Sequence, residues 1–314
     1  MGTLSLFEDL PGGLDRALLQ RNLAALAAES VLIGGSSWKY EGWLDQIYET
    51  ANYRVRGKFS KRRFEEECLA EYAATFPIVC GDFSFYQFPS EAFWRKLFLS
   101  AGPALRFAFK VPEEITAKVF PIHPRYGARA GDSNPSFLNA ALLEAAFLGL
   151  LMPYRGRVPV LIFEFGHMAM PVDDFLEALD TFLEKLPPEF RYAIEVRNED
   201  FLVPQYFACL RQHGIAHVLN AWSRMPELDR QLQLPGVFSA PFTVVRALLR
   251  RGRPYEKAVE AFAPYREIQD PNPETRQAIR QVIQRARDLR EPSYIFVNNR
   301  LEGNAPGTIE SLVG

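Results

Sequence analysis

The chain has 314 residues, of which 48% are hydrophobic and 24% charged, a composition that predicts a globular protein with ample material for a core. Its formal net charge is −2, which argues against a general binder of polyanions, although it is compatible with a local basic groove. The three cysteines are odd in number and widely spaced, so they fit neither a disulfide framework nor a thiolate zinc site. They indicate a reducing compartment, and we expect a cytoplasmic protein.

Residues 1–30 are predicted to form an N-terminal helical arm. The first residues lack the basic region and the apolar core of a signal peptide. From Leu14 to Leu26, leucines recur near helical spacing, which favours a helix packed on the outside or bottom of the main domain over a partner-binding arm. The stretch 17–28 carries polar residues and cannot span a bilayer, so we expect no membrane partner.

Short apolar segments alternate with helical patterns from residue 31 onward. Continuously apolar strands are typical of a parallel sheet that is buried on both faces. Eight such units in a chain of this length fit a single-domain (β/α)₈ TIM barrel over 31–314 better than an open doubly wound sheet. The predicted strands lie in 31–40, 77–86, 105–111, 158–165, 191–201, 215–220, 242–246 and 293–299, and the main helices lie in 60–76, 90–100, 136–151, after Pro171, after Pro204 and in 272–289.

Several common kinds of site are not signalled. No Gly-x-Gly-x-x-Gly follows the first strand and there is no Walker A lysine, so the usual dinucleotide and phosphate-loop sites are not expected. No Gly-x-Ser-x-Gly occurs, so the sequence does not predict a serine nucleophile either. The irregular stretch 118–135 holds Arg125 and Arg129 and is either a functional loop or a mobile insertion.

The predicted strands end in polar side chains. In a barrel of this class, the C-terminal ends of the strands line the active site, whereas the opposite face serves stability. Because side chains alternate along a strand, Glu195 and Arg197 share one face, where two buried charges must pair or take part in chemistry. The other residues at strand ends are Trp38, Tyr40, Asp82, Lys110, Glu164, Asn220, Arg246, Asn298 and Asn299.

These residues predict a polar pocket at the mouth of the barrel. Glu164 and Glu195 are candidates for general acid and base, and Lys110 is a third catalytic candidate. Arg197 and Arg246 are suited to hold a carboxylate or phosphate, since arginine offers a bidentate fork. The remaining strand-end residues are predicted to complete the binding site. The alternative is a layer of ion pairs that plugs the top of the barrel.

No metal site is assigned from the sequence. The only support for a divalent metal such as Mg²⁺ or Mn²⁺ comes from Asp82, Glu164 and Glu195, which offer carboxylate oxygens. The four histidines do not form a motif with ligand spacing, so zinc chemistry is not predicted.

Several motifs are shared with one known family. The motifs are Ile-Gly-x-Ser-x-Trp (Ile33–Trp38, with Tyr40 and Trp43), Phe85-Tyr86, Phe-x-Phe-Lys-x-Pro (Phe107–Pro112, then Ile115-Thr116), Glu-x-Arg (Glu195–Arg197), Arg246 and Asn-Asn-x₃-Gly-x-Ala-Pro (Asn298–Pro306). With them the sequence resembles the YecE-like family, domain of unknown function 72, from about Val31 to the C-terminus. The resemblance implies a TIM barrel. It adds little on activity, although a nucleic-acid role has been suggested for the family.

The sequence departs from the pattern of this family at four positions. Cys80 and Asp82 stand where the family has Glu-x-Asn, Ala117 where it has His, and Glu164 where it usually has Gln. If the family shares one chemistry, these changes put that chemistry in doubt here.

Three functions therefore remain open. The first is an enzyme, hydrolase- or lyase-like, that binds a small anionic or phosphorylated ligand at the strand ends. The second is a nucleic-acid-binding or processing protein that uses the loop with Arg125 and Arg129 and an aromatic rim near the predicted mouth. The aromatic residues there are Trp38, Tyr40, Trp43, Phe83, Phe85, Tyr86, Phe88, Phe165, Phe201 and Trp222. The third is a scaffold without catalysis, because the fold alone does not choose among these functions. The sequence does not predict the oligomeric state.

Overall fold

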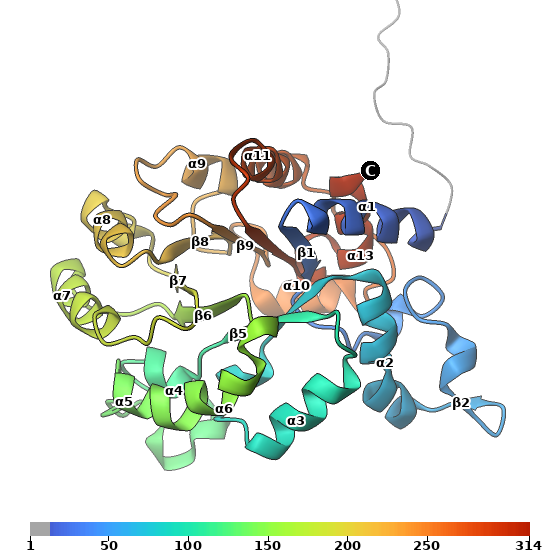
Figure 1. Ribbon diagram of the computed structural model, residues 1–314, viewed down its shortest axis with the longest axis horizontal. Helices are drawn as coiled ribbons and strands as arrows, with labels where there is room; N and C mark the ends of the chain where they lie inside the picture. The colour runs from blue at the N-terminus through green and yellow to red at the C-terminus, as the bar shows by residue number, and fades with distance from the viewer. Residues whose placement is uncertain (1–12) are drawn as a thin grey trace, which may run out of the picture.

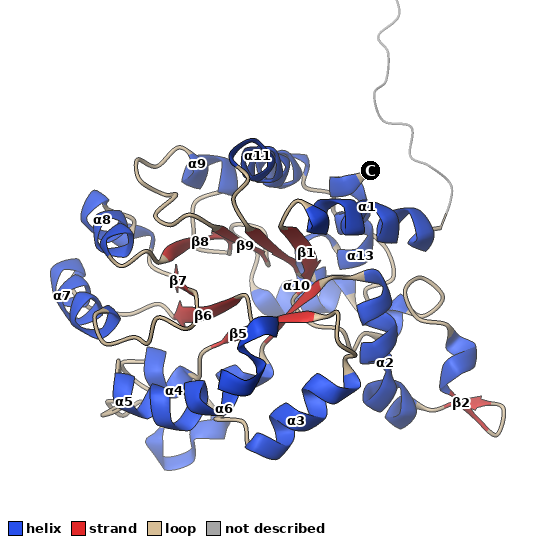
Figure 2. Cartoon of the chain, viewed as in Figure 1, coloured by secondary structure: helices blue, strands red, loops and turns tan. Residues whose placement is uncertain are grey.

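The structure is a computed structural model that describes residues 13–314. Its centre is a closed barrel of eight parallel strands that pair with their neighbours in chain order, and helices surround it (Figure 1; Figure 2). The predicted TIM barrel is therefore confirmed. The barrel strands are β1 (Val31–Gly35), β4 (Ile78–Gly81), β5 (Arg106–Lys110), β6 (Val160–Phe165), β7 (Tyr192–Val196), β8 (Ala216–Ala221), β9 (Thr243–Ala247) and β10 (Ser293–Val297).

Several of the surrounding helices begin at a capping side chain. Ser60, Ser90 and Asn272 each accept a hydrogen bond from a backbone N–H in the first turn, which satisfies a donor that the helix itself leaves free. The helices are α1 (Arg16–Ala28), α2 (Lys61–Thr75), α3 (Glu91–Ser100), α4 (Glu113–Thr116), α5 (Ala140–Leu143), α6 (Gly149–Leu151), α7 (Val172–Leu183), α8 (Pro204–Gln212), α9 (Leu228–Leu232), α10 (Tyr255–Phe262), α11 (Pro273–Leu289), α12 (Asn299–Glu302) and α13 (Ala305–Val313). A hairpin of β2 (Arg54–Val55) and β3 (Lys58–Phe59) lies outside the barrel.

The helix predicted over 136–151 starts later than expected. Leu138 has a positive φ of 54°, and Asn139 caps the helix by accepting a hydrogen bond from the N–H of Leu142 (3.0 Å). Between α5 and α6, the residues Glu144–Leu148 form a π-helical turn. The periodicity of the apolar residues did not reveal the cap, which depends on a single side chain, or the π-helical turn, which adds one residue to a single turn.

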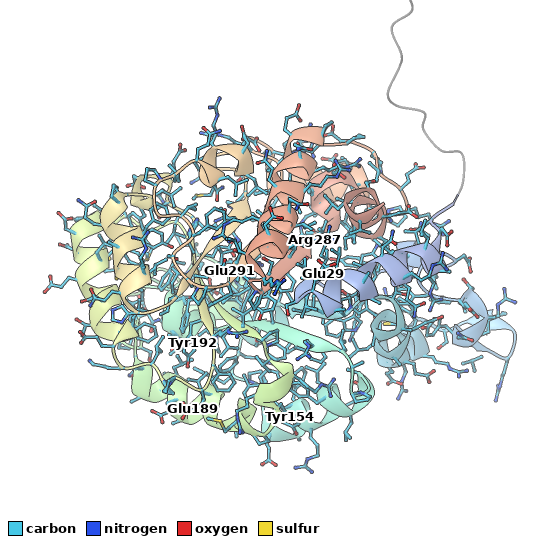
Figure 3. All side chains as sticks on the ribbon, turned by 45° about the horizontal axis from the view of Figure 1, so that its top comes forward. Glu29, Tyr154, Glu189, Tyr192, Arg287 and Glu291 are labelled. Atoms are coloured by element: carbon cyan, nitrogen blue, oxygen red, sulfur yellow. The ribbon has the colours of Figure 1, made fainter. Side chains whose placement is uncertain are left out.

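The N-terminal helix α1 packs on the outside of the barrel. Leu19 and Leu23 are buried, and α1 contacts β1, α2 and α13. Just after α1, Glu29 forms an ion pair with Arg287 of α11 (2.5 Å; Figure 3). The part of the predicted arm in 1–12 lies outside the described residues. Within 13–314, no helix combines the length and apolarity needed to cross a membrane.

The strands bury two different faces. In β6, Val160 and Ile162 belong to an apolar cluster with residues of the other barrel strands, whereas Leu161 and Phe163 pack in the large cluster between barrel and helices. Since side chains alternate along a strand, the first pair points into the barrel and the second pair outward. By the same alternation, Glu164 faces the interior, one layer closer to the C-terminal mouth.

Gly34 lets β1 approach β4 closely. A Cβ atom at Gly34 would lie 1.8 Å from the carbonyl oxygen of Ile78. Tyr72 of α2 fixes this approach, since its hydroxyl accepts a hydrogen bond from the N–H of Gly35 (2.7 Å) and donates to the oxygen of Ile78 (2.9 Å). Any larger residue at position 34 would separate the two strands where the barrel closes.

Candidate functional site

A cavity of about 740 Å³ opens at the C-terminal ends of the barrel strands. Every strand contributes to its lining, either from its last residues or from the loop directly after it. This is the face on which barrels of this class carry their active sites. The contributing residues, in strand order, include Ser36, Asp82, Lys110, Glu164, Arg197, Trp222, Arg246 and Asn298.

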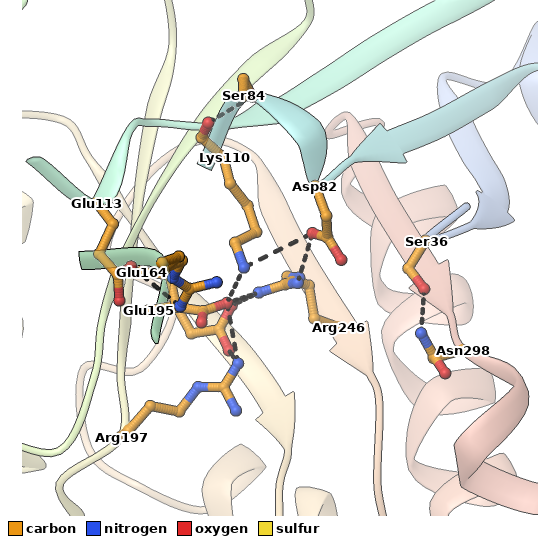
Figure 4. A network of polar contacts seen from close by, with 11 residues as sticks. Ser36, Asp82, Ser84, Lys110, Glu113, Glu164, Glu195, Arg197, Arg246 and Asn298 are labelled. Carbon is orange, nitrogen blue, oxygen red and sulfur yellow. Dashed lines mark hydrogen bonds and ion pairs between the residues drawn. The ribbon is translucent and has the colours of Figure 1, made fainter. Parts of the chain in front are cut away.

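Glu164 is the centre of a charged network in this cavity (Figure 4). Its Oε2 lies 3.1 Å from Nζ of Lys110 and 3.0 Å from Nη2 of Arg197. The same oxygen accepts a hydrogen bond from Nη1 of Arg246 (2.5 Å). One carboxylate thus contacts three cations, which come from the ends of β5, β7 and β9.

Glu195 lies beside Glu164 on the neighbouring strand and is fully buried. Its Oε1 is 2.7 Å from Nη2 of Arg197, and its Oε2 accepts a hydrogen bond from Arg246. Asp82 is more exposed, and its Oδ1 lies 3.7 Å from Nζ of Lys110 and 3.5 Å from Nη2 of Arg246. The network therefore joins three acids to three bases.

The neighbouring charges fix the protonation states in the network. Burial opposes ionisation of Glu164, but Arg197, Lys110 and Arg246 outweigh this effect and hold the pKa of its carboxyl well below the ordinary value. Burial alone would lower the pKa of Lys110, but Asp82 and Glu164 raise it above the ordinary value. At neutral pH, Glu164 is therefore a carboxylate and Lys110 an ammonium ion, and neither is ready to exchange a proton.

Arg197 has hydrogen-bond donors without partners. Its side chain is 6% exposed, and it contacts both glutamates through Nη2 alone. Its Nε and Nη1 are buried and have no hydrogen-bond partner within residues 13–314. The guanidinium carbon lies 3.7 Å from the ring centre of Trp222, which holds the group in place. Buried donors without partners are costly, so Arg197 is the arginine of the network with the most unused hydrogen-bonding capacity.

The cavity is more basic than the whole chain. Its lining includes eight Lys or Arg residues and only four Asp or Glu residues, whereas the net charge of the protein is −2. The basic residues include Lys39, Arg62, Lys96, Arg125 and Arg300, which lie outside the central network. Such local charge attracts anions more than the total charge suggests, because a cavity with low-dielectric walls focuses the field.

The other strand-end residues divide into two groups. Trp38, Tyr40 and Asn298 line the cavity, and burial raises the pKa of Tyr40 to about 12, so its hydroxyl keeps its proton. Asn220 and Asn299 do not line it. The side chain of Asn220 donates to the oxygen of Val196 (3.3 Å), and that of Asn299 accepts from Nε1 of Trp43 (3.1 Å).

The stretch 118–135 brings one of its two arginines to the cavity. Arg125 lines the cavity, with its guanidinium carbon 4.4 Å from the ring centre of Tyr86, and it also pairs with Glu113 (3.4 Å). Arg129 pairs with Glu114 (3.2 Å) and does not line the cavity. The loop therefore contributes a single, partly neutralised cation.

Sequence reasoning missed most of the outer wall of the cavity. Arg62 lies on α2 and Lys96 on α3, where the rule about strand ends gives no signal. Arg300 and Lys39 lie beside strand-end residues that the sequence pattern does identify, so a longer window after each strand would have found them. Tyr255, at the start of α10, completes the wall.

The three acids of the network are a poor site for a divalent cation. Glu164 contacts Lys110, and Glu195 and Asp82 contact Arg246. A Mg²⁺ or Mn²⁺ ion there would share these oxygens with cations that are already hydrogen-bonded to them. These carboxylates and cations are therefore better suited to an anion bound beside the cations than to a metal ion bound between the acids.

Comparisons with known proteins place the chain among barrels of one family. The sequence model of a family described as "Protein of unknown function DUF72" matches residues 32–314. A DUF72 family protein from Thermotoga maritima is 20% identical, with 90% of this chain and 97% of that chain covered and a TM-score of 0.58. One from Enterococcus faecalis is 16% identical, with 90% and 94% covered and a TM-score of 0.58. At these identities the structures show a shared fold alone. Among curated proteins, none matches this sequence.

Proposed function

This chain belongs to the DUF72 family, and we propose that it is an enzyme, hydrolase- or lyase-like, that binds a small anionic or phosphorylated substrate at the C-terminal ends of its strands. The observation that carries the proposal is Arg197, a buried arginine at the cavity with two donor nitrogens that have no partner within the described residues. A phosphate or carboxylate oxygen is the acceptor that suits a guanidinium best.

Lys110 supplies the second charge for the substrate anion. It is buried, lines the cavity and is held as a cation by Asp82 and Glu164. Its ammonium also lies 3.6 Å from the ring centre of Phe85, which restricts its position. Lys110 and Arg197 both contact the same oxygen of Glu164, so they lie near enough to bind one anion together.

The acids of the network have different roles in this proposal. Glu195, one of the two acid–base candidates from the sequence, is fully buried and does not line the cavity, so we assign to it the orientation of Arg197 and Arg246. Glu164 faces the cavity but has a depressed pKa, so it holds the cations in place. Asp82 lines the cavity, is 35% exposed and lies 3.7 Å from Lys110, which makes it the acid best placed to take a proton from substrate or water.

Anion binding is tested with inorganic phosphate and sulfate, measured by calorimetry. We expect wild type to bind and the variants Arg197→Gln and Arg197→Lys to bind about ten- to a hundredfold more weakly, because each loses hydrogen bonds to a charged partner. Arg230→Gln is the matched control, since the side chain of Arg230 is exposed and forms an ion pair with Asp229 (3.8 Å) away from the cavity. The binding proposal is wrong if wild type binds neither ion, or if the Arg230 variant weakens as much as the Arg197 variants.

Catalysis is tested separately, by release of the leaving group from a panel of phosphate and carboxylate esters. We expect Asp82→Asn to lower the turnover of any accepted ester by about a hundredfold or more, as is usual when a general base is removed. Asp173→Asn, an exposed acid at the start of α7, is the control. If phosphate binds through Arg197 but Asp82→Asn leaves turnover intact, the binding part stands and the role of Asp82 is wrong.

A second candidate function, nucleic-acid binding, is favoured by one observation. Tyr86 lines the cavity, is 54% exposed and carries Arg125 over its ring, an arrangement that suits a stacked base. In that case Tyr86→Ala would weaken binding of a short single-stranded oligonucleotide, and the affinity would fall steeply with salt. Binding of phosphate without binding of the oligonucleotide would exclude this candidate.

A further inference from the structure

A group of metal-ligating side chains lies outside the barrel, and none of its members lines the cavity. Asp180 is on α7, Cys209 is on α8, and His213 directly follows α8. One possible ligand atom from each residue lies within 4.8 Å of the other two. All three side chains are partly buried, so a solvent ion can still reach them.

The side chains of Cys209 and His213 both contact the same oxygen atom of Asp180. Nε2 of His213 lies 2.7 Å from Oδ1 of Asp180, and Sγ of Cys209 donates to the same oxygen at 3.7 Å. Cys209 and His213 are four residues apart, which places them on the same face of the helix, toward α7. Sulfur, nitrogen and carboxylate oxygen therefore meet between two consecutive helices.

We propose that Asp180, Cys209 and His213 bind one Zn²⁺ ion, with water as the fourth ligand. Zinc takes thiolate, imidazole and carboxylate ligands at about 2.0–2.3 Å in a tetrahedron, which implies separations between ligand atoms of about 3.2–3.8 Å. The contact of 3.7 Å between Sγ of Cys209 and Oδ1 of Asp180 lies in this range, whereas the hydrogen-bonded contact of 2.7 Å between Nε2 of His213 and Oδ1 must lengthen by about 0.5 Å or more when the ion replaces the hydrogen bond. On binding, the thiol of Cys209 releases its proton to solvent, and the carboxylate and the neutral imidazole each donate a lone pair to the ion.

The same three residue types could instead form a nucleophilic triad, but the geometry disfavours this. In a triad the base contacts the nucleophile, whereas here the sulfur contacts the carboxylate of Asp180. Within the described residues, no hydrogen bond joins Cys209 to the imidazole of His213. An ion that takes all three atoms at once accounts for their convergence on one point.

The spacing of the histidines in the sequence could not reveal this site. His213 has its cysteine partner four residues earlier, but Asp180 lies 29 residues before Cys209 and is brought near by the packing of α7 on α8. The site is separate from the anion cavity, so the two proposals stand or fall independently.

The experiment is a titration of the EDTA-treated full-length protein with Co²⁺, followed by absorbance, with Zn²⁺ as competitor. We expect a sulfur-to-cobalt charge-transfer band that saturates at one ion per chain and disappears when Zn²⁺ is added. Cys68 and Cys80 are fully buried, so this band reports Cys209. Cys209→Ser should abolish the band, and Asp180→Asn should weaken Co²⁺ binding by about tenfold or more, since even the groups around metal ligands contribute that much.

Thermal melting separates a metal site from a simple hydrogen-bonded contact. Asp180→Asn keeps an oxygen that can accept hydrogen bonds, so a merely structural contact would leave its melting temperature and its response to Zn²⁺ like those of wild type. We expect Zn²⁺ to raise the Tm of wild type by about 2 °C or more and that of Asp180→Asn by less. Glu177→Gln, an exposed acid one turn earlier on α7, is the control and should respond like wild type. Folded wild type without the cobalt band, or an equal response of Cys209→Ser and wild type to Zn²⁺, would overturn the proposal.

Discussion

Carboxylates are buried beside arginine both at the mouth of the barrel and around Glu302. The two regions differ in how completely their buried polar atoms are hydrogen-bonded. The fully buried Glu302 accepts hydrogen bonds from Nε and Nη2 of Arg276, from the hydroxyl of Thr308 (2.7 Å) and from the N–H of Asn272 (2.5 Å). At the mouth, by contrast, Arg197 and Arg246 keep buried nitrogens without partners within the described residues. A saturated cluster is a structural device, whereas spare donors beside a cavity indicate a site that takes a ligand.

The largest effect is expected for Glu302→Ala. It leaves the partly buried Arg276 and the N–H of Asn272 without their acceptor and removes one of the two acceptors of the Thr308 hydroxyl, so the free energy of unfolding should fall by about 3–5 kcal/mol. Urea denaturation measures the loss. Phosphate affinity of the folded variant should equal that of wild type, and a weakened affinity would show that the two regions are coupled.

The sharpest form of the comparison is a pair of identical substitutions, Arg276→Gln and Arg197→Gln. Arg276 makes three of the five hydrogen bonds to Glu302, so its loss should cost about 3 kcal/mol of stability and leave phosphate binding unchanged. The loss of Arg197 leaves Glu164 paired with Lys110, so it should cost only about 1 kcal/mol of stability but weaken phosphate binding by about ten- to a hundredfold. Urea denaturation measures the stability of both variants, and calorimetry measures their phosphate affinity. If both variants lose stability and affinity to the same extent, the two regions do not differ in role.

Replacing a whole ion pair at the mouth should cost little stability. In the double variant Glu195→Met/Arg246→Met, both charges leave together, and buried pairs replaced in this way are often neutral or up to about 4 kcal/mol more stable. We expect the urea midpoint of the double variant to equal or exceed that of wild type. Its phosphate binding should be weaker, because Arg197 loses the ion pair with Glu195 that orients it. A large loss of stability would favour the interpretation of the network as a structural plug.

The stability of the mouth should depend on pH in the acid range. Because the folded-state pKa of Glu164 is depressed, its contribution is fully present above the ordinary glutamate value of about 4.3 and is lost as the pH falls further toward the folded value. The variant Glu164→Gln should therefore lose less stability than wild type between about pH 5 and pH 3. Denaturation at a series of pH values measures this slope, with the exposed Glu184→Gln as control. Equal slopes for wild type and Glu164→Gln would contradict the expectation.

The smallest effect is expected at the surface. Arg63 and Glu67 form an exposed ion pair four residues apart on α2, with 2.9 Å between Nε and Oε2. Glu67→Gln should lower the free energy of unfolding by only about 0.3–0.5 kcal/mol, and added salt should reduce that difference. If urea denaturation shows a much larger loss of stability for Glu67→Gln, burial does not explain why ion pairs in the two buried clusters are expected to contribute more to stability than exposed ones.

The sequence alone was enough to predict the strands, the barrel fold and several polar side chains at the strand ends. Apolar runs of five or six residues specify strands buried on both faces, and the alternation of side chains along a strand is enough to put Glu195 and Arg197 on one face. These signals are local, because a strand and its polar last residue depend on neighbours in the chain. They predicted the barrel and the charged side chains of the central network at its mouth.

Only the tertiary structure decided which of those side chains share a cavity and which do not. The sequence pattern placed Asn220, Asn298 and Asn299 alike at strand ends. In the structure Asn220 lies within β8 and Asn299 begins α12, and the side chains of both are hydrogen-bonded away from the cavity that Asn298 lines. Asp180 and Cys209 came together only through the packing of α7 on α8. Contacts between distant segments depend on how whole helices and strands pack, and the periodicity of a single segment does not predict that packing.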